Sequence, residues 1–156
     1  MTAQERLILI DKIRHLPAQL EELVIGLSIP QLTTQFLAHE WTVAQNVHHL
    51  ADSHMNSYIR CKLILTEANP PLKPYDQEAW ADLPDAQSAE LASSLTLLKH
   101  LHARWVTFWE TLPTEAWSRS GFHPENGPMT LADILRSYAA HGEAHLSQIT
   151  RTLAAQ

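Results

Sequence analysis

Residues 41–66 read WTVAQNVHHLADSHMNSYIRCKLILT, a stretch without glycine or proline. Apolar side chains recur in it at the spacing of one helix face, and they are Val43, Val47, Leu50, Cys61 and Leu65. Thr42 is a residue type favoured at helix N-caps, and Asn69-Pro70-Pro71 would end the helix because proline cannot continue its hydrogen bonds. The stretch therefore predicts an amphipathic helix from Thr42 to about Thr66.

Three other segments also carry apolar residues at spacings of three and four, which predicts helices. They are Thr2–Leu27, Ser88–Leu112 and a helix that begins at the N-cap Thr130 and runs through Leu153. Pro17 lies inside the first of them and predicts a kink or a short break there. Because no strand pattern separates the helices, the sequence predicts an all-α fold, an antiparallel four-helix bundle formed by residues 1–156 as a single domain.

Two long connections interrupt the helical pattern, one between the second and third helices and one between the third and fourth. Prolines and polar residues are concentrated in Pro70–Ala86 and in Phe122–Pro128, so both are expected to be loops. Loops of such length in small domains are often functional. In an up-down-up-down bundle these two connections would lie at opposite ends.

The charge and cysteine content exclude several classes of protein. Eleven lysines and arginines stand against 17 acidic residues, a formal net charge of −6, so a basic surface for nucleic acid is not expected. Cys61 is the only cysteine, so the fold is expected to hold by packing without an intrachain disulfide. The apolar runs are too short to span a membrane, and no signal-peptide pattern opens the chain. These features predict a cytoplasmic protein with no membrane partner.

Ten histidines are the unusual feature of the composition, because imidazole is the commonest metal ligand and acid–base group. His141 and His145 are four residues apart, so they project one turn apart from the same helix face, as two ligands of one metal ion would. A third ligand would come from the 42–66 helix, which offers His48, His49 and His54. Periodicity puts His54 at the centre of the apolar face and His49 about 120° to one side. It favours His54 but does not decide among the three.

A polar strip follows the His49 side of that helix and contains Ser53, Asn56 and Arg60. Such a strip could line a pocket, or it could mark the boundary between core and solvent. The residues alone leave both interpretations open.

Several blocks of the sequence resemble the YfiT-like branch of the DinB superfamily. The longest is Trp41–Arg60, which lies within the stretch quoted above. The others follow in that family's order and at about its spacing, and they are Pro74-Tyr75-Asp76 with Trp80, Leu101–Trp105, Phe122–Glu125 and Tyr138–His145. The resemblance covers nearly the whole chain.

The resemblance implies a four-helix bundle that binds one divalent metal ion per chain, nickel or zinc, through three histidines. Carried over to this sequence, the ligands are His49, His141 and His145. The resemblance thus overrules the helical periodicity that favoured His54.

The chain departs from the family pattern at three positions of the last helix. Ala140 stands where the family has an aromatic residue, and Ala144 and Gln148 stand where it has further histidines. The family's N-terminal extension also has no counterpart here. None of these departures removes a ligand.

Three neutral imidazoles leave positions on a metal ion open to water or substrate, as in catalytic zinc sites. The resemblance implies one of two reactions there: metal-dependent hydrolysis, or transfer of a low-molecular-weight thiol of the bacillithiol type to an electrophile. In both, the metal lowers the pKa of the group bound to it and so generates the nucleophile. The expected partners are a small-molecule substrate and, from the resemblance, a second copy of the chain in a homodimer.

We expect Asp52, Asn56 and Arg60 to line or brace the pocket. Arg60 could bind a substrate carboxylate through its bidentate fork, or it could pair with an acidic residue of a neighbouring helix. Asp52 could accept a hydrogen bond from His49 and orient it, or it could be a surface carboxylate.

Three further side chains have a functional and an ordinary interpretation, and a fourth, Cys61, has only an ordinary one. His123 could lie near the mouth of the pocket, although loop histidines are common. Tyr75 and Trp80 could cover the site or cap the core. Cys61 lies on the apolar face and is expected to be an inert core thiol.

The alternative to an enzyme is a dimeric helical scaffold or a small-molecule sensor with a structural or vestigial metal site. Structural sites usually have four protein ligands, often cysteines, and neither feature is evident here, which favours an open site. The substrate and the native metal do not follow from the sequence, because histidine ligands accept nickel, zinc, iron and copper.

Overall fold

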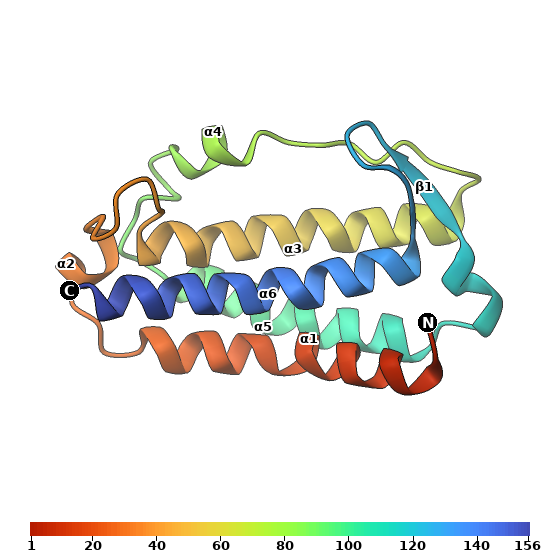
Figure 1. The fold of residues 1–156 in the computed structure, drawn as a ribbon, viewed down its shortest axis with the longest axis horizontal. Helices are drawn as coiled ribbons and strands as arrows, with labels where there is room; N and C mark the ends of the chain where they lie inside the picture. Colours follow the sequence, from red (N-terminus) through yellow and green to blue (C-terminus); the bar gives the residue numbers. More distant parts are fainter.

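The computed structural model describes residues 1–156 and is built around four long helices. Their bounds, with those of the shorter elements, are α1 Ala3–Val24, α2 Ile29–Thr33, α3 Val43–Thr66, α4 Gln77–Ala81, α5 Ala92–Glu110, the 3-10 helix η1 Thr114–Ser118, β1 Ser120–His123, β2 Gly127–Thr130 and α6 Leu131–Ala154 (Figure 1). The N-caps of α1, α3 and α6 are Thr2, Thr42 and Thr130, and each closes a capping box with the residue three positions on. The predicted four-helix bundle is confirmed.

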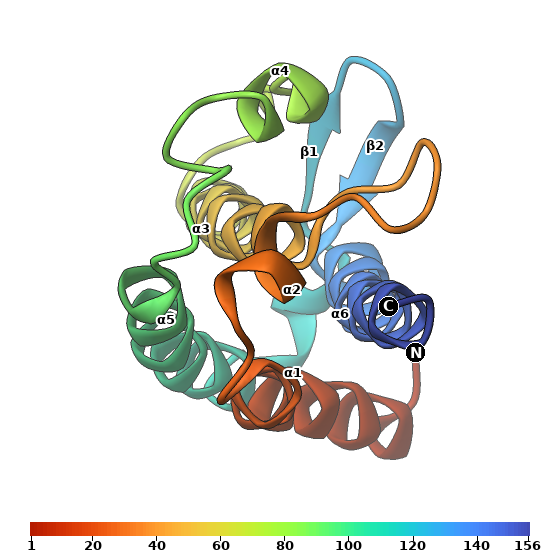
Figure 2. The same ribbon diagram turned by 90° about the vertical axis from the view of Figure 1, so that its left-hand side faces the viewer.

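The direction of the helices differs from an up-down-up-down arrangement. Seen end-on, α1 and α3 lie at opposite corners of the bundle, with α5 and α6 between them (Figure 2). Helices α3 and α5 run in the same direction, because residues 67–91 return along the whole length of the bundle before α5 begins (Figure 1). A 24-residue helix such as α3 is about 36 Å long, and an extended chain covers about 3.3 Å per residue. The connection is therefore long enough for this return, and it brings α4 over the outer side of α3.

The predicted loop Phe122–Pro128 is in fact part of a two-stranded hairpin. Strands β1 and β2 pair antiparallel, with Phe122 opposite Pro128. The other long connection joins this hairpin, since Phe122 N donates to Pro70 O at 2.9 Å and Leu72 N donates to Phe122 O at 2.8 Å. The strands are only four residues long, too short for alternation to reveal them in the sequence. The hairpin and residues 70–72 are thus hydrogen-bonded to each other, and they lie beside α3 and α6.

Pro17 does not end α1, which continues to Val24. The neighbouring Leu16 and Leu20 are fully buried in the core, so packing of α1 against α5 and α6 holds the helix together on both sides of the proline. The predicted break is thus absent, although the main-chain hydrogen bond that residue 17 would donate is missing.

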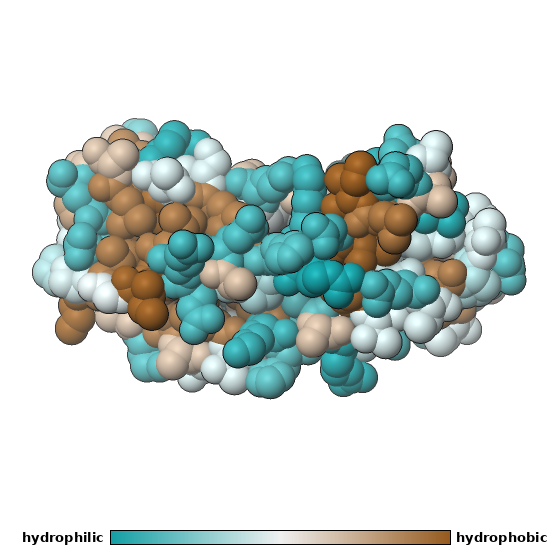
Figure 3. Space-filling view, turned by 90° about the horizontal axis from the view of Figure 1, so that it is seen from below, coloured by the Kyte–Doolittle hydropathy of each residue, from teal (hydrophilic) through white to brown (hydrophobic).

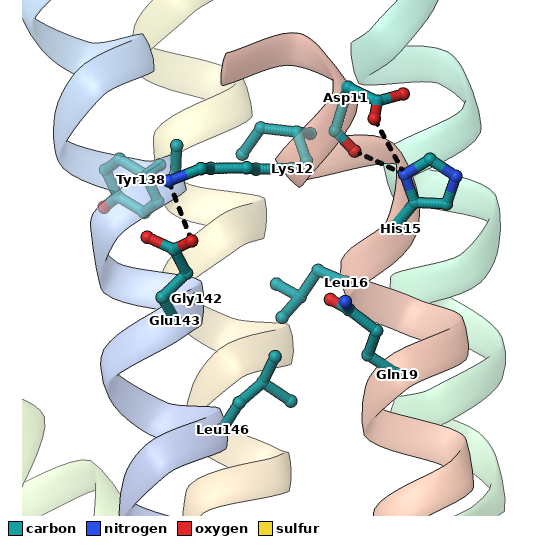
Figure 4. Close-up of a pocket in the computed structure, with 11 residues that line it drawn as sticks. Asp11, Lys12, His15, Leu16, Gln19, Tyr138, Gly142, Glu143 and Leu146 are labelled. Atoms are coloured by element: carbon teal, nitrogen blue, oxygen red, sulfur yellow. Dashed lines mark hydrogen bonds and ion pairs between the residues drawn. The ribbon is translucent and has the colours of Figure 1, made fainter. Parts of the chain in front are cut away.

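Helices α1 and α6 lie in close contact at Gly142. A Cβ atom at this position would lie 2.8 Å from Leu16 Cδ2, closer than van der Waals contact allows. Figure 4 shows Leu16 directed toward Gly142, and beside them Lys12 Nζ pairs with Glu143 Oε1 at 2.8 Å. The absence of a side chain at Gly142 therefore permits this close contact between parallel neighbours.

The apolar core is divided into two clusters along the bundle axis. Between them lies a layer of buried polar side chains that includes His49, His54 and His102. Polar groups also cover the middle of the α1 side of the molecule, with apolar side chains toward both ends (Figure 3). No helix is long and apolar enough to cross a membrane. The polar layer is the feature that the packing of the helices does not explain.

Candidate metal centre

Three histidines meet at the polar layer, one from α3 and two from the antiparallel neighbour α6. The Nε2 atom of His141 lies 3.1 Å from Nε2 of His49 and 3.1 Å from Nε2 of His145. One ligand atom from each ring lies within 4.8 Å of the others. The structure thus brings together the three residues that the resemblance implied as ligands.

Burial keeps these imidazoles neutral at physiological pH. It lowers the pKa of His49 to about 3, with a further contribution from His145. Burial likewise lowers the pKa of His141 to about 3 and that of His145 to about 4. Neutral imidazole is the form that binds metals, because its unprotonated nitrogen carries the lone pair.

Asn46 orients His145. The amide Nδ2 of Asn46 donates to Thr42 O at 2.9 Å, which leaves its Oδ1 to accept from Nδ1 of His145 at 2.7 Å. With its proton on Nδ1, neutral His145 has an unprotonated Nε2 that faces the other two rings. Three neutral imidazoles with converging Nε2 atoms, one of them held in this tautomer, fit the donor set of a divalent ion such as nickel or zinc.

Trp41 covers one side of the three histidines. Its ring is stacked at 14° to His145 with centroids 6.1 Å apart, and it lies 4.7 Å from the ring of His49. The indole Nε1 donates to Glu78 Oε2 at 3.0 Å, which ties Trp41 to α4. Residues 67–91, which connect α3 to α5 and contain α4, are therefore tied to Trp41 beside the three histidines.

The other histidines of α3 do not reach the centre. His54, which periodicity favoured as a ligand, lies behind His141, with its Nε2 3.2 Å from His141 Nδ1. His48 points toward α5 and lies 2.8 Å from Ser94 Oγ and 2.9 Å from Ser88 O. The centre of the apolar face of α3 points into the core, and the ligand position lies at its edge toward α6.

A polar cavity of about 640 Å³ opens beside the three histidines. His141 forms part of its wall, and the other residues that matter here are Ser53, Arg60, Tyr75, His123 and Tyr138. A second cavity, of about 320 Å³, reaches His141 and His145 past His39 and Trp41. Gln77 lines both cavities, so they adjoin on either side of the start of α4.

Arg60 is the one of the three predicted pocket residues that lines the larger cavity. Its Nη2 donates to the main-chain oxygen of Lys73, rather than to a carboxylate of a neighbouring helix. Asp52 does not hydrogen-bond His49, and burial together with Asp85 raises the pKa of its carboxyl. The side chain of Asn56 donates to the carbonyl of Asp52 at 2.9 Å and takes no part in the cavity wall.

Of the four remaining candidate residues, two line the larger cavity and two do not. His123 is buried and lines the cavity from β1, and Tyr75 lines it from the crossing connection. Trp80 packs against Tyr75 with centroids 4.4 Å apart but is itself outside the cavity wall. Burial raises the pKa of the Cys61 thiol to about 12, as expected for an inert core thiol.

Sequence reasoning missed Asn46, which determines the tautomer of His145. The available signal was its position three residues before His49, which places both on nearly the same face of α3. That spacing indicates a shared face, but only the packing of α6 shows that the amide reaches His145.

The comparisons with known proteins agree with this geometry. The family model described as "DinB superfamily" matches residues 12–149. "Putative metal-dependent hydrolase YfiT" of Bacillus subtilis is 43% identical over 142 residues, which is 90% of this chain and 80% of that protein. A relative from Oceanobacillus iheyensis with the same general description is 44% identical over 141 residues, 90% of this chain and 81% of its own.

A solved structure is similar over almost the whole fold. It is that of YfiT from Bacillus subtilis, described as a probable metal-dependent hydrolase with an unusual four-helix bundle topology. The two structures superpose with a TM-score of 0.94 and 40% sequence identity, over 97% of this chain and 87% of the other. The family match and these relatives show that the chain belongs to the DinB superfamily.

Proposed function

We propose that this protein is a metal-dependent enzyme, a hydrolase or a thiol S-transferase, with one divalent ion bound by His49, His141 and His145. The observation that carries the proposal is the convergence of the three Nε2 atoms, within 3.1 Å for two pairs, at the wall of a polar cavity. Three protein ligands leave room on the ion for a water molecule or a substrate.

A divalent ion held by His49, His141 and His145 would lower the pKa of a bound water or thiol and so supply a nucleophile at neutral pH. The protein holds the three imidazoles neutral and fixes His145 through Asn46. Trp41 packs against the rings of His49 and His145 and is held to α4 through Glu78. The larger cavity admits the substrate, and Arg60 offers a fixed positive charge there.

The presence of two adjoining cavities favours group transfer as the second candidate reaction. Hydrolysis requires one organic substrate and water, whereas thiol transfer requires a thiol and an electrophile bound at once. Cavities of about 640 and 320 Å³ both reach His141, so there is space for two molecules beside the same ligand.

The test begins with elemental analysis of protein purified without a tag or chelator, where we expect about one divalent ion per chain. The loaded protein is then assayed on a panel of esters and amides, and on a low-molecular-weight thiol mixed with an alkylating electrophile. Turnover that disappears on chelation and returns on addition of nickel or zinc supports the proposal. A protein that contains no metal and takes up none contradicts it. Metal binding without any turnover favours the sensor or scaffold instead.

Replacement of Arg60 tests the substrate class. For a substrate that carries a carboxylate, Arg60→Ala is expected to raise KM by about 10- to 100-fold with little change in kcat, since one charge-assisted hydrogen bond is worth about 1.5–3 kcal/mol. The matched control is Arg104→Ala, whose guanidinium lies over the Tyr58 ring on the outside of the bundle. Equal KM values for Arg60→Ala and the control would show that Arg60 does not bind the substrate.

A further inference from the structure

A chain of hydrogen bonds crosses the bundle behind the metal centre. His141 Nδ1 lies 3.2 Å from His54 Nε2, and His54 Nδ1 lies 2.8 Å from His102 Nε2. His102 Nδ1 in turn lies 2.6 Å from the main-chain oxygen of Ile13. The chain therefore joins α6 to α3, α3 to α5, and α5 to α1, and it ends on a carbonyl group.

Pro17 explains why this carbonyl is free. In an α-helix the oxygen of residue 13 accepts from the N–H of residue 17, but Pro17 has no N–H. The oxygen of Ile13, a residue that is 1% exposed, would then be buried without a partner, which is costly. His102 supplies that partner from α5.

The main-chain oxygen of Ile13 determines which ring nitrogen carries the proton in each of the three hydrogen-bonded histidines. An oxygen of this kind can only accept, so His102 carries its proton on Nδ1 and, when neutral, accepts at Nε2. His54 must then donate from Nδ1 and accept at Nε2, and His141 must donate from Nδ1. The reverse order requires a charged His102, and no carboxylate is among its hydrogen-bond partners to compensate a buried charge.

The surroundings exclude competing partners. His54 and His102 are 0% and 1% exposed, and their rings are stacked at 10° with centroids 4.9 Å apart. The ring of Trp105 packs nearly perpendicular to both histidine rings. The ring of Tyr138 packs nearly perpendicular to that of His54. Neither histidine has any other hydrogen-bond partner, so the chain is the only arrangement that satisfies their four nitrogens.

We propose that His54 and His102 are positioning residues, which hold His141 as its Nδ1–H tautomer through the carbonyl that Pro17 leaves free. The Nε2 lone pair of His141 is then directed at the point where His49 and His145 converge. This inference rests on the metal site of the proposed function. It assigns a role to two buried histidines and one helix-internal proline that ligand binding alone does not explain.

The test compares His102→Leu with His102→Gln. Leucine removes the chain, whereas the amide of glutamine can accept from His54 and donate to Ile13 in place of the two ring nitrogens. Competition with a chromophoric chelator is expected to show a zinc or nickel affinity about 10- to 100-fold weaker for the leucine variant, with substantial recovery in the glutamine variant. In metal-free protein, ¹⁵N NMR of the histidine rings is expected to show His141 as the Nδ1–H tautomer in the wild type and a mixture of tautomers in His102→Leu.

Two controls separate this role from a general effect on packing. His48→Leu removes another buried histidine between α3 and α5, one that bonds Ser94 and Ser88 instead, and is expected to leave metal affinity unchanged. Pro17→Ala keeps every histidine but returns an N–H that competes for the oxygen of Ile13, so it is expected to shift the His102 Nδ1–H resonance and weaken metal binding less than His102→Leu.

A His102→Leu protein that binds metal as tightly as the wild type and keeps His141 in one tautomer would overturn the inference. An equal loss of affinity in His48→Leu would also overturn it. If the wild type binds no metal at all, the proposed function fails, while the tautomer of His141 in the metal-free protein still decides whether the chain acts as described.

Discussion

Replacing His49 or His145 by alanine, each separately, is expected to lower the affinity for nickel or zinc by about 10²- to 10³-fold. Sites with four protein ligands bind zinc with roughly 10–16 kcal/mol, so one ligand contributes on the order of 3–4 kcal/mol. The two residues come from different helices, and the Nε2 atom of each lies 3.1 Å from Nε2 of His141. Elemental analysis of both variants, purified in the same way as the wild type, should therefore find little bound metal.

The matched control for the ligand variants is His123→Ala. His123 is a buried histidine of the neighbouring cavity, and its Nδ1 accepts from the main-chain N–H of Glu125 at 3.3 Å. This variant is expected to retain the full metal content. Retention of metal by His49→Ala or His145→Ala would show that the ion binds elsewhere.

The metal-free protein is expected to unfold in mild acid, between about pH 5.5 and 4.5. Burial lowers the pKa values of His49 and His141 to about 3 and those of His102 and His145 to about 4. In the unfolded chain each would titrate near 6.5, so below that pH the unfolded state binds protons that the folded state does not. The stability that depends on these four groups is complete above about pH 6.5 and is lost as the pH falls toward 4.

The free energy of unfolding is expected to fall steeply as the pH is lowered. Each such histidine contributes about 1.4 kcal/mol per pH unit, and four together contribute about 5 kcal/mol per pH unit. This decrease would cancel a typical free energy of unfolding of about 5–15 kcal/mol within a few pH units. Urea denaturation followed by circular dichroism at a series of pH values measures the slope. His141→Gln, with one titrating group fewer, should show a slope shallower by about 1.4 kcal/mol per pH unit. A denaturation midpoint that stays constant from pH 7 to 4 would contradict the assignment of neutral buried histidines.

The four long helices could be predicted from the sequence because each has a strong apolar period, and α3 and α6 also have the recognisable N-caps Thr42 and Thr130. The parallel direction of α3 and α5 could not, since a connection of this length permits either direction. The hairpin at Phe122 was missed because its hydrogen bonds depend on Pro70 and Leu72, far away in the chain.

The candidate site was predictable only in part, because periodicity identifies the centre of a buried face and a ligand can lie at its edge. His54 occupies that centre and contacts His102, while His49 lies where α3 meets α6. The spacing of Asn46 from His49 and the proline at position 17 are visible in the sequence, but their roles depend on which atoms of another helix lie opposite. The homodimer expected from the resemblance stays a prediction.

The hydrogen-bonded pair His49 and His141 is separated by 92 positions in the sequence. Closing a loop of that length costs about 4 kcal/mol of chain entropy, which the packing of the bundle must supply before the three ligands can act together. In the unfolded chain His49 is not held beside His141 and His145, so the ion binds the folded state far more tightly. By thermodynamic linkage, free ion at 100 times its dissociation constant then adds about 2.7 kcal/mol to the free energy of unfolding. Metal supply is thus expected to control how much folded protein persists, as well as how much of it is active.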